Sequence, residues 1–393
     1  MVLKSMKATS NLISVLINAG LVIVSILLVL LLVEAALWIF HIPPYPEGVY
    51  NVLQIDERNG YKFRPNAVST RSSSEFDTPV TINSIGLRDY ASVDKNSKPY
   101  AFLLGDSFAE GHGVNIEQTI AKRLQDNTGK LVANLGIASS GTIQHVNIFR
   151  RYLDIFSHKP KYAILVFYVG NDYYDNRRFS DHFSVTGRSL NTVSNGYLVD
   201  DGTSIVQNDS WLILYNEDGN EVRRSKNPQF HPPKGYENKY LDWSKIYNIF
   251  VWENSPRNKD CQINNAVVGL LDSSYDFALS REWEIAKIAL AEFNRIAIEN
   301  AIIPVLVIMP SKFQLNAGLL TDAGCNIEKL NAFQSIDILE KYAKDNGLLN
   351  INLAPIFTAL PPKEFDKLYY KKDVHLTPWG NEFVANTISD ILK

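Results

Sequence analysis

The stretch Tyr100–Gly111, with the sequence YAFLLGDSFAEG, decides the fold. Five apolar or aromatic residues run directly into Gly105-Asp106-Ser107. This pattern predicts a buried parallel strand that ends in a turn, with a serine hydroxyl at the carboxyl end of the strand. Ligands bind at that edge in open α/β sheets. Ser107 is therefore a candidate nucleophile, which needs a general base and oxyanion donors from other segments.

Strands and helices alternate along the chain on the carboxyl side of this stretch. The predicted strands are Tyr100–Leu104, Leu131–Asn134, Tyr162–Val169, Pro304–Met309 and Leu348–Asn352, and the predicted helices are Ile116–Asn127, Ile143–Ser157, Ser280–Asn300, Glu328–Asp345 and Pro378–Leu392. The strands are short and apolar, which indicates a sheet that is buried on both faces. We therefore predict an α/β domain with a doubly wound parallel sheet of about five strands.

The N-terminus holds a candidate transmembrane helix. Leu12–Val33 is nearly continuous apolar sequence, and its 22 residues form about 33 Å of helix, enough to cross a bilayer core. Lys4 and Lys7 precede this segment, and no basic residue follows it until Arg58. The distribution of basic residues predicts a cytoplasmic N-terminus and an extracytoplasmic remainder. A cleaved signal peptide is the alternative, but the run is long for one and no small-x-small cleavage site follows it.

The rest of the chain divides into a stalk and the α/β domain. We predict a cytoplasmic tip and anchor at residues 1–41, a stalk packed on the core at 42–98, and the α/β domain at 99–393. An insertion interrupts that domain at about 173–279, with a hairpin after Trp211–Tyr215 and a helix at Tyr240–Trp252. Arg88, near the end of the stalk, is interpreted as a surface or packing residue, with a place facing the site as the alternative.

Composition argues against several classes of function. The formal net charge of −3 provides no basic field for nucleic acid. The two cysteines, Cys261 and Cys325, form no C-x-x-C pair, and the seven histidines are scattered, so we expect no metal site and no cofactor. A Cys261–Cys325 disulfide and two free thiols both remain open.

Four segments with reactive side chains fall at strand ends or helix starts. They are Gly105-Asp106-Ser107, Asn134–Thr142, Tyr168–Asp172 and Asp373–Gly380. His375 has the right side chain to take the proton of Ser107, and Asp373 can orient its imidazole. Candidate oxyanion donors are the Ser107 N–H, a backbone N–H at Ser139 or Gly141, and the Asn171 side-chain amide. His112, five residues after Ser107, is the rival base.

These segments resemble blocks I, II, III and V of the SGNH hydrolases, also called GDSL-type esterases, and the anchor resembles that of their bacterial membrane-bound members. The resemblance implies a flavodoxin-like three-layer α/β/α fold, a serine nucleophile and a histidine base. The sequence departs from the family pattern at two places. Ser139 stands where block II usually has glycine, with Gly141 as the alternative equivalent. Asp373 and His375 are two residues apart, whereas the family spaces them by three.

The sequence thus predicts a membrane-anchored, extracytoplasmic serine esterase. Its expected substrate is an acylated glycan or other envelope ester, with acetyl as the expected acyl group, and we expect no nucleic-acid partner. Two alternatives remain open. One is an O-acyltransferase that uses the same triad with a sugar hydroxyl as acceptor, and the other is a non-catalytic glycan-binding protein on a degenerate hydrolase fold.

Overall fold

The computed structural model describes most of the chain outside the insertion. The described residues are 2–39, 52–56, 59–73, 75–177, 179, 192–193, 196–197, 204–207, 211–215, 221–226, 244, 246, 277–316, 318–319 and 331–392. The chain divides into two compact units. The first comprises Met1–Pro46 and Phe230–Ser255, and the second comprises Glu47–Gln229 and Pro256–Lys393. Each unit is described by itself.

A five-stranded parallel sheet forms the centre of the second unit. Its strands are β5 (Ala101–Gly105), β6 (Val132–Asn134), β7 (Tyr162–Tyr168), β13 (Ile303–Met309) and β14 (Leu349–Asn352), in the order β14-β13-β7-β5-β6. The chain leaves β5 for β6 on one side and then returns to place β7 on the other. This is the flavodoxin-like strand order, and its switch point lies between β5 and β7. The predicted fold class is confirmed.

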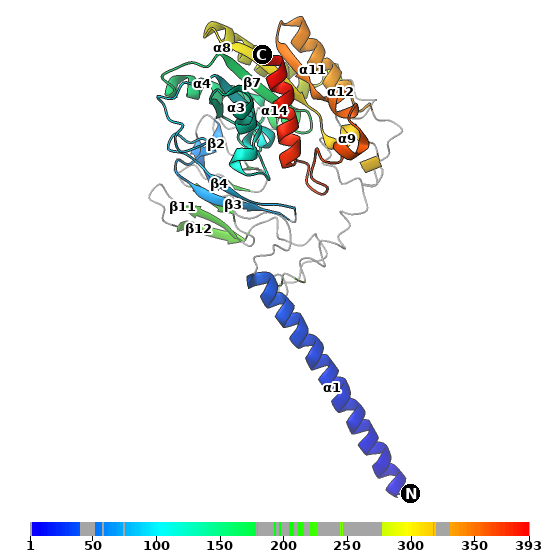
Figure 1. Ribbon diagram of the computed structural model, residues 1–393. Helices are drawn as coiled ribbons and strands as arrows, with labels where there is room; N and C mark the ends of the chain where they lie inside the picture. The colour runs from blue at the N-terminus through cyan, green and yellow to red at the C-terminus, as the bar shows by residue number, and fades with distance from the viewer. Residues whose placement is uncertain are drawn as a thin grey trace. The chain divides into compact units, whose positions relative to one another are not determined.

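Helices cover both faces of this sheet, as Figure 1 shows. Successive side chains of a strand point to opposite faces, so Phe102 and Leu104 pack in one hydrophobic cluster whereas Ala101 and Leu103 pack in the other. The first cluster includes residues of α4 (Thr142–Ile155), α8 (Arg281–Glu299) and α11 (Gln334–Asp345). The second includes residues of α3 (Ile120–Thr128), α12 (Leu353–Thr358) and α14 (Pro378–Leu392). Burial on both faces explains why the three central strands, β5, β7 and β13, consist of apolar and aromatic residues.

Short hairpins and helices complete this unit. The antiparallel pairs are β1 (Leu53–Asp56) with β2 (Gly60–Phe63), β3 (Val68–Ser72) with β4 (Asp77–Thr81), and β8 (Thr192–Val193) with β9 (Gly196–Tyr197). A separate antiparallel sheet contains β10 (Ser204–Gln207), β11 (Trp211–Tyr215) and β12 (Glu221–Lys226), as the hairpin prediction requires. The short helices are α2 (Ser107–Glu110), η1 (Ile116–Gln118), η4 (Phe277–Leu279), α9 (Lys312–Leu315) and α13 (Pro362–Phe365). Val80, Ile82 and Leu87, in and after β4, belong to the same hydrophobic cluster as β5.

One predicted helix is wrong in its continuity. Ile116–Asn127 was expected as a single helix, but the structure divides it into η1 and α3 at Thr119. Thr119 has extended backbone angles, and its side chain accepts a hydrogen bond from Lys122 N at 3.3 Å. A threonine that caps a new helix in this way cannot continue the preceding one. Asn115 and Gln118 form a capping pair at the start of η1, where Asn115 N donates to Gln118 Oε1 at 3.1 Å.

The first unit contains α1 (Val2–Ile39). Its segment Val15–Leu37 spans 23 residues with a mean hydropathy of 3.0, so it is long and apolar enough to cross a membrane. Glu34 is buried near the end of this segment and accepts hydrogen bonds from Ser244 Oγ at 2.9 Å and Ile246 N at 3.1 Å. Of the predicted helix at residues 240–252, only positions 244 and 246 are described. Both cysteines lie outside the described residues.

Candidate active site

Ser107 is the first residue of α2, directly after the turn that ends β5. Asp106 caps this short helix, and its Oδ1 accepts a hydrogen bond from Phe108 N at 2.9 Å. Gly105 has a φ of +147°, and a Cβ there would lie 2.8 Å from Val166 O. Glycine therefore lets the chain turn sharply against β7. The turn holds the Ser107 side chain at the switch point of the sheet, where only 6% of its surface is exposed.

The structure brings Ser107, His375 and Asp373 together. Ser107 Oγ lies 2.7 Å from His375 Nε2, and His375 Nδ1 lies 2.6 Å from Asp373 Oδ1. Because Asp373 only accepts, the imidazole proton resides on Nδ1 and the lone pair of Nε2 faces the serine hydroxyl. Asp373 Oδ1 also accepts the backbone N–H of His375 at 2.8 Å. This local turn lets a carboxylate two residues away reach the imidazole, so the short spacing is compatible with a triad.

The ionisation of Asp373 suits this arrangement. Burial by itself raises the pKa of Asp373, but the hydrogen bonds and charge of His375, together with the charge of Lys312, outweigh it. The pKa of Asp373 therefore lies below its ordinary value. The carboxylate stays charged and can stabilise an imidazolium at His375.

Two side chains that the sequence analysis did not single out hold the loop that contains Asp373. The Glu75 carboxylate, between β3 and β4, accepts the N–H groups of Lys371, Lys372 and Asp373 at 2.8, 2.8 and 2.7 Å. On the carbonyl side, Lys312 Nζ donates to Asp373 O at 2.5 Å. Lys312 follows the carboxyl end of β13, so the strand-end rule applied to Ser107 would have found it. No local signal marks Glu75.

The two candidates for the block II oxyanion donor differ in their backbone. Gly141 is the N-cap of α4, and its N–H donates to Gln144 Oε1 at 3.1 Å. Ser139 has a φ of +61°, in the left-handed region that favours glycine. This conformation agrees with the glycine that the family pattern has at that place. Of these two backbone N–H groups, that of Gly141 is thus already engaged within the described residues.

Asn171 lies in the turn after β7, the strand next to β5, and its side chain is close enough to Asp106 to lower the pKa of that carboxyl. Burial nevertheless raises the pKa of Asp106 to about 6, although the hydrogen bond from Phe108 N, the charge of His375 and the side chain of Asn171 oppose that shift. Burial also raises the pKa of the neighbouring Asp172 well above its usual range, and the charges of Asp106 and Asp175 raise it further. The raised pKa favours the neutral form of Asp172, which avoids a second buried negative charge beside Asp106.

Arg88 is a packing residue, and it is 1% exposed rather than on the surface. Its guanidinium donates to Glu110 O at 2.9 Å and Val114 O at 2.6 Å, and also to Gly111 O. These carbonyls belong to the end of α2 and the loop that follows it. Arg88 therefore fixes the segment that contains His112, on the carboxyl side of the nucleophile.

His112 does not occupy the place of a base for Ser107. Its Nδ1 lies 2.8 Å from Arg71 Nη1, and its ring stacks on that of His375 at 3.9 Å between centroids. His112, Asp373 and His375 place potential ligand atoms within 4.8 Å of one another. An arginine only donates, so the free lone pair of His112 faces Arg71 and its Nε2 is protonated. That tautomer does not present the Nε2 lone pair to a metal ion on the Asp373 side.

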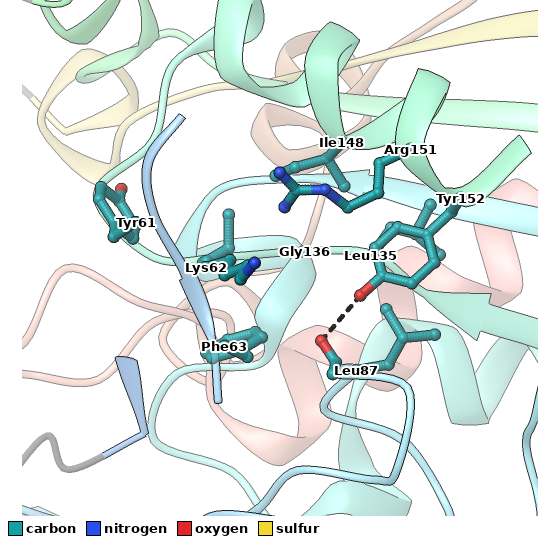
Figure 2. Close-up of a pocket in the computed structure, with 11 residues that line it drawn as sticks. Tyr61, Lys62, Phe63, Leu87, Leu135, Gly136, Ile148, Arg151 and Tyr152 are labelled. Atoms are coloured by element: carbon teal, nitrogen blue, oxygen red, sulfur yellow. Dashed lines mark hydrogen bonds between the residues drawn. The ribbon is translucent and has the colours of Figure 1, made fainter. Parts of the chain in front are cut away.

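A small pocket lies apart from these residues, between β2, the turn at Gly86 and α4 (Figure 2). Its lining comprises Tyr61, Lys62, Phe63, Gly86, Leu87, Leu135, Gly136, Ile137, Ile148, Arg151 and Tyr152. Tyr152 Oη donates to Gly86 O at 2.9 Å across one end of it. Arg151 Nη2 bonds Asp56 Oδ2 at 2.5 Å, so its charge is already paired. The pocket belongs to the packing of β2 against the core.

No protein-family model matches the sequence, and no match is found among curated proteins. Among solved structures, the chain is similar to a GDSL-like lipase from Bacteroides thetaiotaomicron VPI-5482 (14% identity, 77% of this chain, 92% of that one, TM-score 0.35). It is also similar to a lipase/acylhydrolase from Enterococcus faecalis (12% identity, 74% of this chain, 94% of that one, TM-score 0.35). A third similar structure is that of a member of the lipolytic protein G-D-S-L family from Veillonella parvula DSM 2008 (10% identity, 74% of this chain, 96% of that one, TM-score 0.36). The functional proposal therefore rests on the geometry of the site.

Proposed function

We propose that the chain is a serine esterase of the SGNH type. The observation that carries this proposal is the continuous hydrogen-bonded series from Ser107 Oγ through His375 to Asp373, with distances of 2.7 and 2.6 Å. A largely shielded carboxylate, an imidazole and a hydroxyl in this order are the groups that activate a serine for attack on a carbonyl. The alternative of a degenerate, non-catalytic fold has no support in this geometry.

The reaction has two halves. Ser107 Oγ attacks the ester carbonyl carbon while His375 Nε2 takes the hydroxyl proton, and a tetrahedral oxyanion forms. Collapse of that intermediate breaks the bond to the leaving alcohol, which receives the proton from His375. Water then attacks the acyl-enzyme with His375 again acting as base, and the carboxylic acid and free Ser107 are released.

Three donors are assigned to the oxyanion. They are the backbone N–H groups of Ser107 and Ser139 and the side-chain amide of Asn171. Ser139 is preferred to Gly141 because the N–H of Gly141 is bonded to Gln144. Loss of one such donor typically lowers kcat about 10²–10³-fold.

The proposed substrate is an acylated envelope glycan that loses a short acyl group such as acetyl. The support is indirect: α1 is long and apolar enough to anchor the chain in a membrane. Lys4 and Lys7 precede its apolar segment, which favours an extracytoplasmic catalytic domain. An esterase on that side of the membrane meets envelope polymers. Attack on the acyl-enzyme by a sugar hydroxyl in place of water would give acyl transfer, and the experiment below distinguishes the two reactions.

The test uses the full-length protein in detergent micelles. Ser107→Ala should abolish aryl-acetate hydrolysis and labelling by a fluorophosphonate, whereas the exposed Ser157→Ala should keep both. Full activity and labelling in Ser107→Ala would overturn the proposal. Acyl transfer to an added oligosaccharide that outpaces hydrolysis would identify a transferase with the same triad.

A further inference from the structure

Two histidines, and not one, lie against the triad carboxylate. Asp373 Oδ1 binds His375 Nδ1, and the other carboxylate oxygen, Oδ2, lies 3.9 Å from His112 Nε2. The two imidazole rings are nearly parallel, with 12° between their planes and 3.9 Å between their centroids. The proposed reaction uses His375 alone and leaves the second ring without a role.

The tautomer of His112 is fixed by a buried ion pair. Arg71, on β3, donates from Nη1 to His112 Nδ1 at 2.8 Å and pairs with Glu110 at 3.1 Å. An arginine never accepts a hydrogen bond, so the proton of the neutral His112 ring is on Nε2. Within the described part of the chain, this buried Nε2 has no hydrogen-bond partner. A buried N–H without a partner is uncommon, and Oδ2 of Asp373 lies 3.9 Å from this one.

His112 is also held neutral. The groups that face it are the cations Arg71 and Arg88, the triad pair His375 and Asp373, and the edge of the Phe76 ring. Burial, followed by the charges of His375, Arg71 and Arg88, lowers the pKa of His112 well below its ordinary value. His375 gains and loses a proton in each half-reaction, whereas the lowered pKa of His112 favours its neutral ring.

We propose that His112 is a positioning residue for the triad, whose Nε2–H supports Asp373 Oδ2 and whose ring stacks on that of His375. This inference rests on the proposed function. The 3.9 Å separation shortens to a hydrogen bond when substrate binds, as catalytic hydrogen bonds commonly do. The N–H then compensates part of the Asp373 charge, while the π face of a neutral ring accommodates the imidazolium of His375 better than a second cation would.

A matched pair of variants separates the donor from the packing. His112→Gln places an amide N–H near the position of Nε2, whereas His112→Asn keeps an acceptor for Arg71 and lacks that donor. We expect His112→Asn to lower kcat for an aryl acetate about 10-fold with little change in KM. Without the donor, the negative charge of Asp373 is less compensated at the triad. The midpoint of the acid limb of kcat/KM should therefore rise by about 0.5 pH unit. His112→Gln should restore both values.

The exposed His158 gives a control, His158→Asn, which should match the wild type. Wild-type values in His112→Asn, or equal losses in both His112 variants with no shift of the midpoint, would overturn the inference. If His112→Asn does not fold, NMR of the histidine-labelled wild type decides, since His112 should be the Nε2–H tautomer and should not titrate between pH 5 and 8. Titration there, or an Nδ1–H tautomer, would overturn the inference. Absence of fluorophosphonate labelling in the wild type would instead refute the esterase itself.

Discussion

Replacement of Glu75 by glutamine tests whether the segment before β5 shapes the active site. In the structure the Glu75 carboxylate accepts three successive backbone N–H groups, at Lys371, Lys372 and Asp373. Oε2 accepts two of them and Oε1 accepts the third. A glutamine has a single carbonyl oxygen, which can replace only one of the two carboxylate oxygens. Its NH₂ group then faces the remaining N–H and cannot accept from it. The hydrogen bonds that remain have a neutral acceptor in place of a charged one.

The size of the effect follows from these bonds. A hydrogen bond to a charged group contributes about 1.5–3 kcal/mol, and a neutral one about 1 kcal/mol. The loss of one bond and the weakening of two others, discounted for the partial exposure of Glu75, amounts to about 2 kcal/mol. If that energy holds Asp373 and His375 in register with Ser107, kcat/KM should fall about 30-fold at constant KM.

Steady-state hydrolysis of an aryl acetate measures this change, and hydrogen exchange reports the loop directly. The amides of residues 371–373 should lose protection in Glu75→Gln, and those of β5 should not. Glu364→Gln, an exposed carboxylate on α13, is the matched control and should behave as the wild type. Unchanged activity together with unchanged protection of residues 371–373 would refute the positioning role of Glu75.

Three further predictions concern the turns around the nucleophile. Because the pKa of Asp106 is raised to about 6, its stabilising effect is complete below pH 3.8 and is lost as pH rises through 6. Asp106→Asn should remove about 3 kcal/mol of the change in the free energy of unfolding with pH, measured by urea unfolding at a series of pH values. An unchanged pH dependence of that free energy would contradict the prediction. Gly136→Ala places a Cβ 2.2 Å from Glu110 N and should destabilise by about 1–3 kcal/mol, whereas an unaltered melting temperature would show that the turn can relax. Ser139→Gly relieves a positive φ and should stabilise by about 1 kcal/mol with activity retained. Loss of activity there would assign a role to the serine side chain.

Local sequence patterns determined the fold. The five predicted strands each lie within one residue of β5, β6, β7, β13 and β14 at either end. Short apolar runs between polar turns are sufficient for this, because the central strands of a parallel sheet are buried on both faces. The start of α14 after Thr377 was also readable, since its hydroxyl accepts the N–H of Gly380 at 3.1 Å. The break at Thr119 was missed because the capping signal before Ile116 masked a second one.

The site was only partly readable. Ser107, Asn171 and His375 were predicted as site residues because each follows a strand end or precedes a helix in a typical motif. Their supporting residues were not found, since Glu75 and Arg71 act on partners far along the chain, at Asp373 and His112. Arg88 was taken for a surface or packing residue for the same reason. Its carbonyl partners lie 22 to 26 residues away and show no pattern in the sequence.

The sequence by itself determined which groups could react and on which elements they lie, because strand periodicity and helix capping are local properties. Only the tertiary structure decided that Ser107 and His375, 268 residues apart, meet at 2.7 Å. It also showed that the N–H of Gly141, one of the two candidate oxyanion donors, is bonded to Gln144. The tautomer and charge state of His112 likewise depend on Arg71, whose position is fixed by the pairing of β3 with β4 and by the buried Glu110.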